Sequence, residues 1–360
     1  MKKLLSILCA LLALASAALA DEVSVVVPEA YRQAGTLPLY RAVTRSRKEQ
    51  PLYDQVQPQW FNQSGEPEYE NTSRRGRYDH YTFPDENSLY VGPESIDYNE
   101  YDGVMQTIPL EEGSPVETLP RPSLKYAVGE LAMGARRCWP KLDAQPQLDK
   151  TQLGGFTLAQ AQARLDALLN QIGLTGYQCV YALDMSVERI RSLGESYKRG
   201  LDSRNTPFPA YETAAEEDEG FFLYYEKFLD GVSLHHEGED SGAFYVSAYL
   251  TADGLHLFQL RETHVIGRVY STPERLLSAG EVRAAFEKGN AKRQRDGFLD
   301  PQLISLTLTY SPARAPQKKD GVVMAPAWLA HYTYQDGRQE TGWAWYSALD
   351  GSLLGDCYTR

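Results

Sequence analysis

The sequence has few of the features that mark nucleic-acid-binding, disulfide-rich or membrane proteins. Its 36 Lys and Arg residues are outnumbered by 48 Asp and Glu residues, for a net charge of -12. A basic patch for nucleic acid or anionic membranes is therefore not expected. Four cysteines in 360 residues are too few for a disulfide scaffold. After residue 20, no apolar run is long enough to cross a bilayer, so we expect no retained membrane span.

Familiar catalytic motifs are also absent. The chain contains no Gly-x-Ser-x-Gly elbow, His-Glu-x-x-His pair, phosphate loop or dinucleotide fingerprint. His235, His236 and Glu237 are the best metal candidates, but neighbours on an extended strand point to opposite faces. The acidic run 216–219 is more typical of an exposed loop than of a glycosidase pair. We therefore predict no catalytic, cofactor-binding or metal-binding residues, with an unrecognised hydrolase as the least favoured alternative.

Residues 1–20 have the three-part pattern of a secretory signal. Lys2 and Lys3 precede an apolar stretch, and a small-residue site favours cleavage after Ala20. Cys9 is a poor lipidation site because Leu8 stands where a small residue is needed. We expect a secreted or extracytoplasmic protein without a lipid anchor.

Three cysteines remain after this signal: Cys138, Cys179 and Cys357. An oxidising compartment would allow one pair to form a disulfide. Cys138 with Cys179 is one option, and the spacing does not decide between the pairs.

Residues 21–122 are rich in tyrosine and proline and show little regular periodicity. Ten of the 24 tyrosines lie before residue 127, which is more aromatic content than a disordered tail carries. We predict an irregular, β-rich segment in which the tyrosines pack. A stacking platform for sugars is the alternative.

Two helix-plus-strand patterns follow this segment. Thr157 to Gln160 has the form of a capping box, and apolar residues continue at helical spacing until Gly173. Ser278 to Glu281 repeats the box, with a helix expected to end before Gly289. Strand-like runs joined by Asp-Gly turns follow each helix. The sequence therefore predicts an α+β fold with two helix-plus-antiparallel-sheet units, 123–270 and 271–360.

The most aromatic stretch is a predicted hairpin within residues 321–354. Two strand-like runs flank a turn at Asp336-Gly337, and neither face of the first run is polar. Such a hairpin can pack on one face and present aromatic rings on the other. We predict an interaction surface on this hairpin made of Trp328, Tyr332, Trp343 and Trp345.

This hairpin carries a family resemblance. Pro326-Ala327-Trp328 and the later run from Ala348 to Leu354 resemble the closing hairpin of extracytoplasmic regulators of the YycH/YycI type and, more loosely, PepSY modules. Ser347 stands where that family often has Asn. The segments "LAQAQARLDALLNQIG", "FLYYEKFLDGVSL", "YLTADGLHLFQL" and "LLSAGEVRAAFEKG" resemble successive parts of the same architecture. The whole is similar to secreted or lipid-anchored Gram-positive proteins of unknown function.

The resemblance implies a non-catalytic extracytoplasmic interaction or regulatory module. YycH and YycI restrain a membrane sensor kinase, and PepSY modules can hold peptidases in check. Those kinase regulators keep a membrane anchor, whereas this chain is expected to lose its own, so control by transmembrane contact is not implied here. An unknown envelope protein is the expected partner, and cell-wall glycan bound by the N-terminal aromatics is the alternative.

Overall fold

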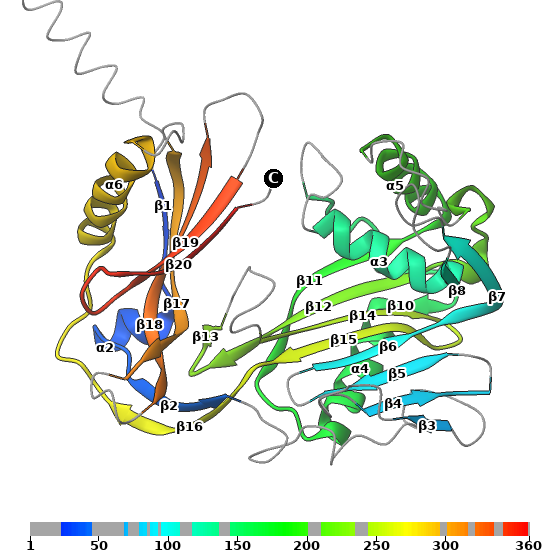
Figure 1. Ribbon diagram of the computed structural model, residues 1–360, viewed down its shortest axis with the longest axis horizontal. Coiled ribbons are helices and arrows are strands. Elements are labelled where there is room, and N and C mark those ends of the chain that lie inside the picture. Colours follow the sequence, from blue (N-terminus) through cyan, green and yellow to red (C-terminus); the bar gives the residue numbers. More distant parts are fainter. Residues whose placement is uncertain are drawn as a thin grey trace, which may run out of the picture. The chain divides into compact units, whose positions relative to one another are not determined.

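The computed structural model describes residues 23–44, 68–70, 79–84, 87–92, 95–108, 117–136, 145–200, 210–234, 244–295, 301–315, 321–334 and 341–358. The chain divides into two compact units. One comprises Met1–Ala42, Asp230–Val232 and Ile266–Arg360, and the other comprises Val43–Leu229 and Ser233–Val265. Both combine helices with mainly antiparallel sheets, as the predicted α+β class requires (Figure 1).

The larger unit is built on a nine-stranded sheet. In spatial order its main path is β11 (Tyr177–Met185), β12 (Gly220–Leu229), β14 (Phe244–Thr251), β15 (Leu255–Glu262), β6 (Ser95–Asn99), β5 (Ser88–Val91), β4 (Asp79–Thr82) and β3 (Glu68–Glu70). The short strand β13 (Val232–Ser233) pairs with β12. All register-defined pairs along this path are antiparallel.

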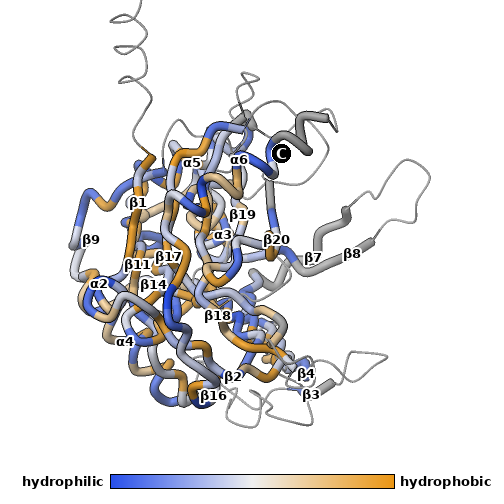
Figure 2. The backbone as a smooth tube through the Cα atoms, turned by 90° about the vertical axis from the view of Figure 1, so that its left-hand side faces the viewer, coloured by the Kyte–Doolittle hydropathy of each residue, from blue (hydrophilic) through white to orange (hydrophobic). Residues whose placement is uncertain are grey.

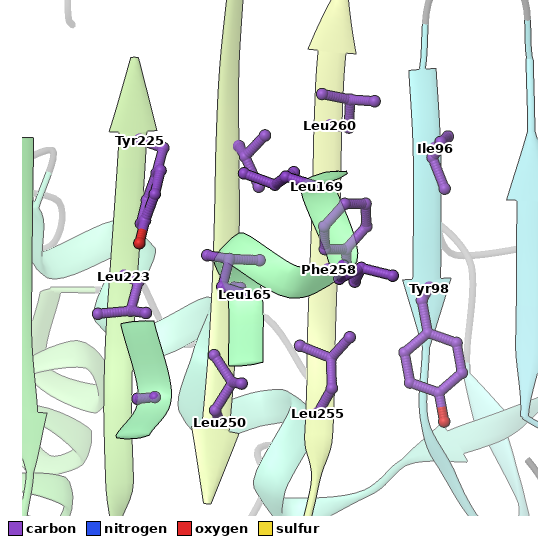
Figure 3. Close-up of a cluster of buried hydrophobic side chains, with 14 of the residues drawn as sticks. Ile96, Tyr98, Leu165, Leu169, Leu223, Tyr225, Leu250, Leu255, Phe258 and Leu260 are labelled. Carbon is purple, nitrogen blue, oxygen red and sulfur yellow. The ribbon is translucent and has the colours of Figure 1, made fainter. Parts of the chain in front are cut away.

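Helix α4 (Leu158–Ile172) covers one face of this sheet. Leu165 and Leu169 project from α4 onto Leu223 and Phe258 in a shared buried cluster (Figure 3). Apolar residues on alternate positions of each strand reach this cluster because successive side chains point to opposite faces. The predicted amphipathic helix is confirmed.

The ends of α4 follow the sequence signals. Thr157 Oγ1 accepts a hydrogen bond from the Gln160 backbone N–H at 3.2 Å, and Gln160 Oε1 accepts one from the Thr157 N–H at 2.8 Å. This is the predicted capping box, which satisfies free N–H groups of the first turn. Gly173 ends the helix with φ 78°, a left-handed conformation that glycine adopts without steric cost.

Two helices that the sequence analysis did not predict pack on the opposite face. They are α3 (Leu124–Arg136) and α5 (Val187–Gly200), and their apolar residues share a cluster with Phe222, Tyr249 and Leu257. At Gly129, a Cβ atom would lie 2.9 Å from the Cβ atoms of both Tyr249 and Leu257. The missing side chain therefore allows α3 to approach the sheet closely.

The smaller unit contains a seven-stranded sheet. Its path is β1 (Ser24–Val26), β17 (Pro301–Arg314), β18 (Val322–Tyr334), β19 (Thr341–Ser347) and β20 (Leu353–Tyr358), with β2 (Leu39–Thr44) paired to β18 and β16 (His264–Ser271) paired to β2. Helix α6 (Ala279–Arg295) packs Phe286 against Tyr332 and Tyr346, with ring centroids 5.5 Å and 6.2 Å apart.

Helix α6 continues past Gly289, where the sequence predicted its end. Glycine inside a helix costs only about 1 kcal/mol relative to alanine, and packing of neighbouring turns can offset this. The prediction was wrong because it took a tolerated interior glycine for a stop signal. The second predicted capping box is confirmed, since Ser278 Oγ accepts from the Glu281 N–H at 3.3 Å.

Strands from residues 21–122 enter both sheets. β1 and β2 lie in the seven-stranded sheet, whereas β3 to β6 lie in the nine-stranded one. Short-range sequence patterns predict a strand but do not identify a pairing partner more than 150 residues away. The remaining elements are helix α2 (Glu29–Ala34), the two-stranded sheets β7 (Tyr101–Ile108) with β8 (Glu117–Pro122) and β9 (Gln152–Leu153) with β10 (Phe156–Thr157), and the 3-10 helices Tyr211–Thr213 and Glu216–Asp218.

Candidate functional site

Three of the four aromatic residues predicted to form an interaction surface are core residues. Trp328 is 1 % exposed, Tyr332 0 % and Trp345 2 %. Trp328 points toward α6 and donates its indole N–H to the Leu277 carbonyl at 2.9 Å. Side chains this buried contact a partner only if the unit opens. They stabilise the sheet and do not form a preformed surface.

Trp343 is the one predicted residue that stays partly exposed. It lies opposite His331 in the β18–β19 register, and the two rings stack with centroids 5.2 Å apart and an interplanar angle of 7°. Both side chains are half-buried. The predicted aromatic surface is thus reduced to a single stacked pair.

The edge strand β1 carries a more exposed apolar surface. Val25 and Val26 are 47 % and 50 % exposed, and Ile304 on the neighbouring strand β17 is 41 % exposed. β1 pairs in parallel with β17, with Val25 beside Leu306 and Val26 beside Thr307. In the described part of the chain, β1 ends the sheet. Figure 2 shows β1 as a hydrophobic stretch of the chain.

The other edges of this sheet carry charged residues. β16 has the exposed residue Arg268, and β20 has the exposed residue Asp356. Natural proteins commonly place charges, prolines or bulges on edge strands to prevent pairing with other chains. Ser24–Val26 carries no charge, proline or bulge, although its length of three residues limits how many main-chain hydrogen bonds an added strand can form. β1 is therefore the edge best suited to accept another strand.

One buried network in the larger unit resembles a hydrolase relay. His256 Nε2 lies 2.8 Å from Thr251 Oγ1, and His256 Nδ1 lies 2.5 Å from Glu100 Oε2. A hydroxyl, an imidazole and a carboxylate in this order match the pattern of nucleophilic hydrolases. The Thr251 hydroxyl, however, donates to Asp253 Oδ1, and Thr251 is only 1 % exposed. A substrate cannot reach it, so the network holds the β14–β15 turn in place.

Lys125 completes this network from α3. Its Nζ lies 2.5 Å from Asp253 Oδ2. Burial alone would raise the pKa of Asp253, but the hydrogen bonds from Lys125 and Thr251 outweigh it and hold this pKa well below its usual range. The charged turn thus ties α3 to the sheet.

The metal and disulfide candidates of the sequence lie only partly within the described residues. Across the described ranges, no three His, Cys, Asp or Glu side chains are grouped to hold a metal ion. The candidate residues His235 to Glu237 and the cysteine Cys138 lie outside those ranges. Cys179 is a free thiol whose pKa is raised by burial. Cys179 therefore forms no disulfide in the structure.

No helix within the described residues is both long enough and apolar enough to cross a membrane.

Comparisons with known proteins show a shared fold and no assigned activity. The chain matches no family model, and no curated protein matches it by sequence. The crystal structure of an uncharacterized protein from Eubacterium rectale has a TM-score of 0.52 at 12% identity, covering 89% of this chain and 86% of the other. The Bacillus megaterium YpeB C-terminal domain has a TM-score of 0.29 at 8% identity, covering 88% and 100%. The second similarity is too low to support an inference.

The run from Ser24 to Pro28 predicts a strand, observed at Ser24–Val26, but sequence reasoning did not mark it as an edge. Its three consecutive β-branched residues, Val25 to Val27, are equally typical of a fully buried strand. Glu22 precedes the run, and Pro28 and Glu29 follow it, so the sequence carries no signal that distinguishes an open edge from a buried strand.

Proposed function

We propose that this protein is a non-catalytic extracytoplasmic interaction module that binds an extended segment of an envelope protein along β1. The observation that supports this proposal is the pair of half-exposed valines on an edge strand without protective charges. A strand that adds to such an edge gains main-chain hydrogen bonds, while alternate side chains provide specificity. The binding mode requires no catalytic residue.

The chemistry of the edge defines the partner segment. Val25 and Val26 point to opposite faces of the sheet, so a bound strand must offer an apolar side chain on each face. The net charge of -12 favours a segment flanked by lysine or arginine, because opposite charge accelerates encounter. The proposed ligand is therefore an extended, apolar segment with basic flanks.

The extracytoplasmic location rests on the signal-like pattern of residues 1–20 and on the resemblance to YycH/YycI-type regulators. The partner would be an envelope protein of the host, reached without a retained anchor. Fractionation of host cells, with N-terminal sequencing of the recovered protein, tests this part. A chain that begins at Asp21 outside the cytoplasm is the expected result, and a cytoplasmic chain beginning at Met1 contradicts it.

Replacement of Val25 by glutamate tests whether the partner binds along β1. The charge would have to be desolvated beside a bound strand, so Val25→Glu is expected to abolish crosslinking to the envelope partner. Leu353→Glu is the matched control, because Leu353 is 49 % exposed on β20 at the other end of the sheet. Equal crosslinking by both variants would contradict binding at β1.

A further inference from the structure

The β7–β8 pair begins and ends at residues that are bonded to each other. Within the described part of the chain, these two strands pair with one another and enter neither large sheet. Glu100 directly precedes β7, Ser123 directly follows β8, and the Ser123 N–H donates to the Glu100 carbonyl at 2.9 Å. The Tyr101 N–H, at the start of β7, donates to Asn87 Oδ1 at 2.8 Å. We call Glu100, Tyr101 and Ser123 the β7–β8 root.

His256 on β15 contacts this root through its side chain. Its Nδ1 atom lies 2.5 Å from Glu100 Oε2. Its Nε2 atom lies 2.8 Å from Thr251 Oγ1 and 3.2 Å from Asp253 Oδ1, both at the β14–β15 turn. The buried Tyr249 ring lies beside it, with centroids 6.4 Å apart. The imidazole thus lies between two carboxylates, one on the root and one on the turn.

The partners of His256 call for a proton on each ring nitrogen. Nδ1 faces a carboxylate, which accepts and does not donate when it is ionised. The Thr251 hydroxyl uses its single proton toward Asp253, so its oxygen accepts from Nε2. Only the doubly protonated, positively charged imidazole can donate from both nitrogens. The contacts therefore match the cationic form of His256.

Two other basic residues bind the same turn, from helices on opposite faces of the sheet. Lys125 Nζ on α3 lies 2.5 Å from Asp253 Oδ2. Arg164 Nη1 on α4 donates to two backbone carbonyls of the turn, at 3.1 Å and 3.0 Å. Among the described residues, however, the ion pair of Glu100 is with His256. His256 is therefore the charged group that joins the turn to the β7–β8 root.

We propose that His256 is a pH-responsive clasp that holds the β7–β8 root to the nine-stranded sheet. Histidine side chains change charge between about pH 5 and about pH 8. After loss of the second proton, one ring nitrogen can no longer donate, and two carboxylates face a neutral ring. The link between Glu100 and the turn then weakens, so the root opens more often as the pH rises. This clasp lies in the larger unit and does not depend on binding at β1.

Amide hydrogen exchange followed by NMR tests the clasp on the chain from residue 21. Exchange of the Tyr101 and Ser123 amides, corrected for the intrinsic effect of pH, reports how often the root opens. We expect their protection to fall about tenfold between about pH 5.5 and about pH 8, because a hydrogen bond to a charged group contributes roughly that factor.

Two histidine variants separate the clasp from other titrating groups. His256→Gln keeps a donor and an acceptor but cannot gain a charge, so root protection should be the same at both pH values. His264→Gln, on β16, is the matched control and should retain the full pH dependence. A pH dependence that persists in His256→Gln would assign the effect to another group and overturn the proposal.

The imidazole nitrogens of His256 give a second test, which uses the unaltered protein and does not depend on folding of a variant. Nitrogen-15 NMR at about pH 5.5 is expected to show a proton on both Nδ1 and Nε2. Loss of one proton should accompany the loss of root protection. A neutral ring at about pH 5.5, or root protection that does not change with pH, would overturn the proposal.

Discussion

The indole N–H of Trp328 donates a hydrogen bond to the backbone carbonyl of Leu277, 2.9 Å away, from inside the smaller unit. This bond joins β18 to the segment that leads into α6. Trp328 was predicted to contact a partner, but it is only 1 % exposed and its indole N–H is used inside the unit. The neighbouring Trp343, on β19, is only half-buried.

Replacing these two tryptophans by phenylalanine should have unequal effects. Trp328→Phe loses a buried hydrogen bond and leaves a cavity, so we expect the free energy of unfolding to fall by roughly 2 kcal/mol. Trp343→Phe keeps an aromatic ring beside His331 and should cost less than about 1 kcal/mol. Urea unfolding followed by fluorescence measures both values. Equal losses would contradict the assignment of Trp328 to the core.

Gly129→Ala should destabilise the larger unit although alanine favours helices. The new Cβ would lie 2.9 Å from Tyr249 and Leu257, and relief of this overlap requires α3 to move. We expect a loss of about 1–3 kcal/mol, larger than the gain of about 1 kcal/mol from helix propensity.

Gly280→Ala in α6 is the control for this substitution. The nearest atom to its new Cβ is Ser278 Oγ at 4.0 Å, so no overlap arises. This variant should be as stable as the unaltered protein or slightly more so. If thermal unfolding shows the same change for both glycine variants, the close approach of α3 to the sheet is not the cause.

The capping box of α4 should contribute measurably to stability. Thr157→Ala removes the oxygen that accepts from the Gln160 N–H, and we expect a loss of about 1 kcal/mol. Thr157→Ser retains that oxygen and should recover most of the lost stability. Hydrogen exchange in residues 158–161 reports the effect directly. Identical exchange rates in the Ala and Ser variants would show that the cap contributes nothing.

The Asp253 turn predicts a pH-dependent contribution to stability. The pKa of Asp253 is lower in the folded protein than its unfolded value of about 4, so folding favours the ionised carboxylate. Its contribution is complete above about pH 5 and is lost as the pH falls through the folded pKa. The difference in unfolding free energy between the unaltered protein and Asp253→Asn should therefore shrink in acid. A difference that stays constant between about pH 7 and about pH 3 would refute this role.

Local signals in the sequence predicted local structure well. The capping boxes at Thr157 and Ser278 are present, and the Asp230-Gly231 turn has φ 50° and 76°, the left-handed pair that tight hairpins need. Long-range relationships were not predictable in the same way. The strand partners of β1 and β6 lie far along the chain, and α3 was missed because Gly129 and Gly134 lower its helix propensity.

The lack of long-range information also explains why the sequence could not show which of the candidate surface residues are exposed. Sequence identified the aromatic hairpin but not the direction of each ring, because both faces of β18 are apolar and Trp328 and Tyr332 lie on the face beneath α6. Burial depends on which elements cover which face, and that follows from the complete topology. Val25 and Val26 were indistinguishable from core residues until β1 was placed at an edge.

Amide hydrogen exchange of β1 is the most direct test of the central claim that this edge binds a protein strand. The chain from residue 21 would be compared alone and with solubilised envelope protein of its host. The account predicts slower exchange at the β1 amides that face away from β17, absent in Val25→Glu and retained in Leu353→Glu, because a bound strand pairs with the free edge. Unchanged exchange in β1 when a partner is bound would contradict the account.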